Sequence, residues 1–118
     1  MLSSLNPPPG KRWPRGQRFL LSARGAEVEA AYRTAVQDVR AQGREALELA
    51  ERRWADPLGL EPCDGVVLSE LRPAKRSLPD LFRALEECGI PAPKVREAIE
   101  RLVTRGMVEP VLLREAAP

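Results

Sequence analysis

The sequence has one long interval without proline, from residue 15 to residue 56, and this interval constrains the fold most strongly. From Ala26 to Ala55 the residues are mostly Ala, Glu, Arg, Leu and Gln, which all favour the α-helix. Pro57 ends the interval, because the residue before a proline is driven out of helical geometry. We therefore expect a long amphipathic helix over residues 25–56, about 45 Å in length.

Apolar residues recur along this interval at spacings of four and three, so they form one narrow stripe on the expected helix. The members of the stripe are Val28, Tyr32, Ala35, Val39, Ala46 and Leu49. Such a stripe suits close packing against one other helix, as in a coiled coil, and it predicts a homodimer. The alternative is a helix that folds back over its own domain, and Gly43 is expected to mark a bend between these two tasks of the helix. Glu29 and Arg33 form an i,i+4 pair in the favourable order.

Positive charge is concentrated in residues 1–24, which carry five basic residues and no acidic one. Pro7–Pro9 and the absence of any apolar period predict a flexible, Pro-rich tail. Its cations are interleaved with two aromatic residues, in the order Lys11, Arg12, Trp13, Arg15, Arg18 and Phe19. Such cations neutralise phosphates while an aromatic ring stacks on a base, which predicts nucleic-acid contacts. The alternative is a solvated arm that keeps the protein dissolved.

Residues 57–118 predict a small separate domain. Gly65–Leu68 is expected to form a short strand after a connection rich in proline and glycine. A helix then begins at the N-cap Ser77, with Asp80 completing a capping box, and ends at Gly89. Its predicted buried face consists of Leu78, Leu81, Phe82, Leu85 and Cys88.

A second helix follows the tight connection after Gly89 and ends at Gly106. Its apolar residues at positions i, i+3, i+4, i+7 and i+8 predict a buried face. These residues are Val95, Ala98, Ile99, Leu102 and Val103. Residues 107–113 are expected to form an edge strand, because Pro110 cannot donate a ladder hydrogen bond.

The segment Ser77–Pro110, and above all residues 95–109, resembles the second and third helices and the following strand of winged helix–turn–helix domains. The resemblance extends over residues 44–113 if Arg44–Ala55 supplies the first helix and Gly65–Leu68 the first strand. It implies a mainly α fold with a short two-stranded sheet. The wing is expected to be reduced, because no turn signal occurs in the C-terminal residues that would form it.

The same resemblance implies a nucleic-acid site on the outer face of the third helix. The basic residues expected there are Lys94, Arg96, Arg101 and Arg105. Lys75 and Arg76, just before the capped helix, are expected to hold the flanking phosphates. Glu97 and Glu100 share the helix and reduce its attraction for a polyanion.

Composition argues against most catalytic chemistry. The chain has no histidine and two cysteines, which removes histidine acid–base catalysis, His-bearing metal sites and the common catalytic triads. Its glycines are scattered singly, so there is no phosphate-binding loop. We therefore expect a protein that is not an enzyme and takes no cofactor or metal. Two thiols in a chain of this length predict free cysteines and a cytoplasmic location, and the short apolar runs predict no membrane span.

Together these patterns predict a basic tail over residues 1–24, a long pairing helix over 25–56 and a winged-helix-like domain over 57–118. The leading hypothesis is a dimeric, regulatory nucleic-acid-binding protein, acting on duplex DNA in transcription regulation. The alternative is a non-catalytic adaptor or structural subunit, whose winged helix and long helix bind other proteins in a larger assembly.

Overall fold

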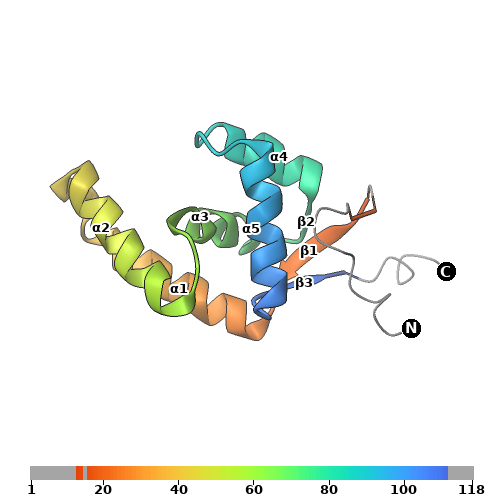
Figure 1. Cartoon of the computed structure of the whole chain (residues 1–118), viewed down its shortest axis with the longest axis horizontal. Coiled ribbons are helices and arrows are strands. Elements are labelled where there is room, and N and C mark those ends of the chain that lie inside the picture. Colours follow the sequence, from red (N-terminus) through yellow and green to blue (C-terminus); the bar gives the residue numbers. More distant parts are fainter. Residues whose placement is uncertain (1–12, 15, 112–118) are drawn as a thin grey trace.

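A computed structural model describes residues 13, 14 and 16–111, and within this part the protein is mainly helical with a small antiparallel sheet (Figure 1). The α-helices are α1 (Ala23–Gln37), α2 (Arg44–Ala55), α3 (Pro62–Leu71), α4 (Leu78–Glu86) and α5 (Ala92–Thr104). The strands are β1 (Arg18–Leu21), β2 (Arg76–Ser77) and β3 (Val108–Pro110). Short 3₁₀ helices at Arg40–Gln42 and Asp56–Leu58 flank α2.

The prediction of one long helix over residues 25–56 is wrong, because this segment forms two helices that fold back on each other. α1 ends at Gln37, and Gly43 precedes α2 with φ of 106°, a value that favours glycine. The sequence alternative, a bend at Gly43, describes what is observed. In Figure 1, α1 and α2 lie side by side as a hairpin that extends away from the sheet.

Two aromatic residues hold the hairpin together. The Tyr32 hydroxyl donates to Glu51 Oε2 at 2.8 Å, and Trp54 Nε1 donates to the Val28 carbonyl at 3.1 Å. The two rings meet edge to face, with centroids 4.9 Å apart. Tyr32 and Trp54 are both buried, so the apolar side of α1 packs against its own chain.

The strand expected at Gly65–Leu68 is wrong as well, because these residues lie within α3. Pro62 occupies the first turn, and the N–H of Glu61 donates to Asp64 Oδ2 at 2.9 Å. Val67 and Leu68 are fully buried. A three-residue apolar run carries no period of its own, so burial in a helix satisfies it as well as burial in a strand.

The sheet has three strands rather than two, and its middle strand comes from the segment predicted to be a flexible tail. The strand order is β2-β1-β3, both pairings are antiparallel, and β1 is the central strand. Phe19 on β1 is fully buried. The predicted tail therefore does not extend to residue 24, since β1 and the start of α1 lie within it. β3 lies at the sheet edge, as Pro110 predicted.

The α4–α5 unit follows the sequence prediction closely. Ser77 caps α4 with Asp80 in a capping box, and Gly89 and Gly106 adopt φ of 81° and 75° after the two helices. The inward residues of α5 are fully buried, and Val103 is half-buried. Cys88 is an exception, because it is exposed rather than buried.

Candidate functional site

Arg101, predicted to contact nucleic acid, instead forms a buried ion pair. Its Nε donates to Asp64 Oδ2 at 2.8 Å and its Nη2 donates to Asp64 Oδ1 at 2.7 Å. Asp64 is fully buried and the Arg101 side chain is 23% exposed. The hydrogen bond to this carboxylate raises the pKa of Arg101 further above its ordinary value. Arg101 therefore joins α5 to α3, and its guanidinium is not presented to a ligand.

Arg96 is also engaged within the fold. Its guanidinium carbon lies 5.2 Å from the ring centroid of Phe82 on α4, within the range of a cation–π contact. Its Nε is buried and has no hydrogen-bond partner among the described residues. Lys94 and Arg105 are exposed, but Glu97 is exposed on the same helix. The outer face of α5 therefore carries mixed charge, and it lacks the four free cations that the sequence predicted.

The remaining residues predicted to contact nucleic acid fall into four groups. Lys11, Arg12 and Arg15 lie outside the described residues. Trp13 is half-buried, with its ring edge to face with Phe19 at 5.3 Å between centroids. Lys75 and Arg18 are exposed. Arg76 is half-buried, and its Nε donates to the Glu70 carbonyl at 2.8 Å.

The residues predicted to form a dimer interface are divided by the turn between α1 and α2. Val28 and Tyr32 are buried in the core of their own chain. Ala35, Val39 and Ala46 are half-buried. Leu49, on the outer side of α2, is 49% exposed. The continuous stripe that predicted a coiled coil is therefore not present on the surface of this chain.

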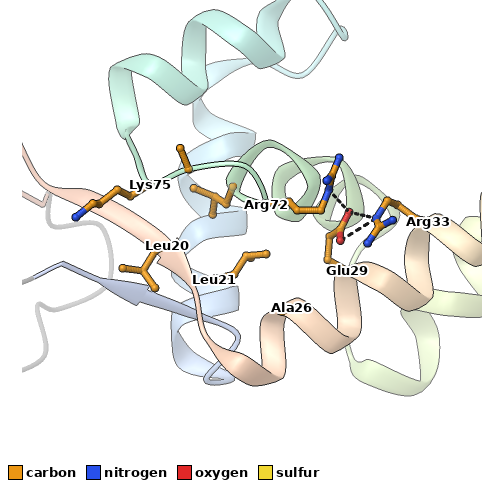
Figure 2. Close-up of a pocket in the computed structure, with 9 residues that line it drawn as sticks. Leu20, Leu21, Ala26, Glu29, Arg33, Arg72 and Lys75 are labelled. Atoms are coloured by element: carbon orange, nitrogen blue, oxygen red, sulfur yellow. Dashed lines mark hydrogen bonds and ion pairs between the residues drawn. The ribbon is translucent and has the colours of Figure 1, made fainter.

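A groove between α1, β1 and the α3–β2 connection gathers cations that the sequence did not bring together. We call it the basic groove; it is an open depression of about 400 Å³. It is lined by Leu20, Leu21, Ala26, Glu29, Arg33, Leu71, Arg72, Ala74 and Lys75. Figure 2 shows Leu20 and Leu21 lying between Lys75 on one side and the Glu29, Arg33 and Arg72 cluster on the other.

One buried carboxylate organises the arginines of the basic groove. Glu29 is 1% exposed and accepts two hydrogen bonds from Arg33 Nε, at 3.0 and 2.9 Å. The same carboxylate accepts from Ser69 Oγ at 3.1 Å and pairs with Arg72 Nε at 3.5 Å. Both arginine side chains remain about half exposed, and their Nη atoms donate no hydrogen bond to another described residue.

Three cations line the basic groove, namely Arg33, Arg72 and Lys75, whereas the carboxylate that lines it is buried beneath two of them. Arg18 is exposed on β1, two residues before Leu20, but it is not among the residues that line the groove. Sequence reasoning missed Arg72 entirely. It named Lys75 as a phosphate contact and the Glu29–Arg33 spacing as a helix pair, but it did not join the two into one site.

The described residues offer no other prominent chemistry. They contain no group of three or more His, Cys, Asp or Glu residues able to hold a metal ion. None of the helices in that part of the chain combines the length and apolar character needed to span a bilayer. Cys63 and Cys88 are free thiols, and burial raises the pKa of the Cys63 thiol.

Comparisons with protein-family models, curated proteins and solved structures find no match to this chain.

Proposed function

We propose that this chain is a non-catalytic nucleic-acid-binding protein and that the basic groove is its phosphate-binding surface. The observation that carries the proposal is the clustering of Arg33, Arg72 and Lys75 around one groove. A polyanion gains from such a cluster by releasing condensed counterions. Glu29 opposes this attraction weakly, because its carboxylate is buried and already paired.

We also propose a winged-helix-like arrangement, shifted from the one that the sequence suggested. In this proposal α3 replaces α2 as the first helix, and β2 replaces Gly65–Leu68 as the first strand. The chain order α3-β2-α4-α5-β3 supports it. β1 would then take the place of the strand that normally follows the wing, because it pairs with both β2 and β3. A strand supplied from before α1 accounts for the missing turn signal after Gly106.

Two lysine variants separate the basic groove from the outer face of α5. Lys75 and Lys94 are both exposed, so Lys75→Glu and Lys94→Glu make the same charge change at the two surfaces. Binding of fluorescein-labelled DNA is measured by anisotropy over a range of salt concentrations. We expect wild-type log K to fall against log salt with a slope of about −3.

Lys75→Glu is expected to weaken binding at low salt and to make the slope shallower by about 1, whereas Lys94→Glu stays close to wild type. Absence of salt-dependent binding to any DNA at micromolar protein would overturn the proposed function. A loss confined to Lys94→Glu would move the phosphate-binding surface to α5.

A second candidate function, a protein-binding adaptor, is favoured by one observation. Among the described residues, Leu49 is the large apolar side chain that stands out as exposed, and it lies on the α1–α2 hairpin. Figure 1 places this hairpin at one end of the molecule. The adaptor role, including pairing with a second copy, predicts that Leu49→Glu abolishes self-association or stoichiometric co-purification of a partner after nuclease treatment. Unchanged behaviour of Leu49→Glu in both assays would remove this candidate.

A further inference from the structure

We infer that the basic groove takes an unpaired nucleic-acid strand in preference to a duplex, an inference that rests on the proposed function. The argument begins with the floor of the groove. Leu20 and Leu21 are half-buried, and together with Leu71 and two alanines they give the groove an apolar floor between its cations. Figure 2 shows this floor with Lys75 at one end and the Glu29 cluster at the other.

An apolar floor finds little apolar surface to cover on a duplex. Paired bases are stacked with their faces hidden, and the duplex exposes phosphate, sugar and the edges of the bases in its grooves. An unpaired base exposes its face, and it can cover apolar side chains while the phosphates on either side reach cations. The groove volume of about 400 Å³ lies within the range of small-ligand sites, so it admits a nucleotide-sized group.

The arginine pair supplies the firmer of the two phosphate contacts. Arg33 Nε and Arg72 Nε both lie within 3.5 Å of Glu29 Oε2, so their guanidinium groups are neighbours. Because Nε faces the buried carboxylate in each case, the Nη atoms are left to bind one phosphate from two sides. Glu29 is a positioning residue here, since its buried carboxylate orients the arginines without facing the strand.

Lys75 completes the arrangement at the other end of the floor. It is exposed, and it lines the groove from the α3–β2 connection. A strand that places one phosphate at the arginine pair and a base over the apolar lining beside it brings its next phosphates toward Lys75. A lysine acts there as a point charge without a preferred geometry, which suits a contact that does not depend on sequence.

The test compares one labelled oligothymidylate of about 12 nucleotides with its duplex at equal salt. We expect the single strand to bind about tenfold more tightly. Leu20→Thr keeps a good strand former but shortens the apolar floor, and should weaken single-strand binding several-fold while leaving duplex binding unchanged. Leu58→Thr, the same change at another half-buried leucine that does not line the groove, is the matched control and should have no effect on either. Circular dichroism is used to check that both variants fold.

Each outcome separates the inference from the proposed function. Equal or tighter duplex binding, or equal loss of both affinities in Leu20→Thr, overturns the single-strand inference and leaves the proposed function standing. Failure of both oligonucleotides to bind overturns both. Competition by an acidic, leucine-rich peptide that removes single-strand binding at lower concentration than unlabelled oligothymidylate would assign the groove to a protein ligand instead.

The positioning role of Glu29 has its own test, a double-mutant cycle. Glu29→Gln should weaken single-strand binding several-fold in the wild-type background. In a background that carries both Arg33→Ala and Arg72→Ala, the same change should have little further effect, because both arginines that Glu29 aligns are already absent. Equal losses in both backgrounds would assign Glu29 a purely structural role.

Discussion

Arg101 on α5 and Asp64 in the first turn of α3 form an ion pair joined by two hydrogen bonds, and this pair decides what Arg101 can do. Asp64 also accepts from the N–H of Glu61 at the start of α3, so one buried carboxylate serves a helix cap and an inter-helix contact. A guanidinium held in this way is part of the scaffold. We therefore expect removal of the Arg101 side chain to lower the stability of the fold.

Arg101→Ala is expected to lower the free energy of unfolding by about 3–5 kcal/mol, because it leaves the fully buried Asp64 carboxylate without its charge partner. Urea denaturation followed by circular dichroism measures the change. Arg53→Ala, at an exposed position on α2, should change stability by about 0.5 kcal/mol or less. An Arg101→Ala protein of normal stability that loses nucleic-acid binding would return Arg101 to the ligand surface.

Gly65→Ala tests how closely α3 approaches the hairpin. A Cβ at this position would overlap the ring of Tyr32, which is held by its hydrogen bond to Glu51. Alanine gains about 1 kcal/mol of helix propensity, but the overpacking costs about 1–3 kcal/mol, so we expect a net loss of stability. Thermal unfolding measures it, and Gly16→Ala is the control because a Cβ there meets open space. Stabilisation by Gly65→Ala would contradict this packing.

Tyr32 should make the protein less stable at alkaline pH. Burial, followed by the hydrogen bond to Glu51 and its charge, raises the pKa of the Tyr32 hydroxyl well above its ordinary value. In the unfolded chain the phenol loses its proton near pH 10, whereas in the folded protein it stays protonated. Stability is therefore fully present below that pH and falls as the pH rises toward the folded-state pKa.

The measurement is the free energy of unfolding at pH 8 and at about pH 10.5. Tyr32→Phe should be less stable than wild type at pH 8 by about 1 kcal/mol, through loss of the hydrogen bond, and should lose less on going to the higher pH. The raised pKa of Cys63 acts in the same direction in both proteins, so it cancels in the comparison. An equal alkaline loss in both proteins would show that Tyr32 does not titrate as described.

Ser77→Ala should lower stability by about 1 kcal/mol, because Ser77 Oγ accepts the N–H of Asp80 at the start of α4. The reciprocal hydrogen bond from the Ser77 N–H lowers the pKa of the Asp80 carboxyl. The stability that this hydrogen bond contributes is therefore fully present above the ordinary carboxyl pKa. It is lost as the pH falls through the lowered pKa of Asp80. Chemical denaturation at neutral pH measures the Ser77 effect, with Thr34→Ala on the exposed side of α1 as control. A change no larger than that of the control would show that the cap contributes nothing.

The α4–α5 unit was predictable because its signals are local. The capping box at Ser77, the glycines at 89 and 106 and the apolar period of α5 all act over a few residues. The hairpin was not predictable in the same way. Residues 38–43 contain no proline, and the turn is stabilised by contacts such as Tyr32 with Glu51, which join residues distant in the chain. The central position of β1 likewise depends on partners far along the sequence.

The candidate site was likewise predictable only in part. The pairing of Glu29 with Arg33 could be seen from the sequence, because i,i+4 residues are neighbours on any helix. The sequence did not show that Arg72 and Leu20 line the same groove as that pair. It also did not show that Arg101 forms an ion pair with Asp64. By itself the sequence determined the helices of the α4–α5 unit and where they start and stop, since those choices depend on nearby residues. Only the tertiary structure decided which charged groups face solvent and which face one another, because long-range packing brings together side chains that the chain keeps apart.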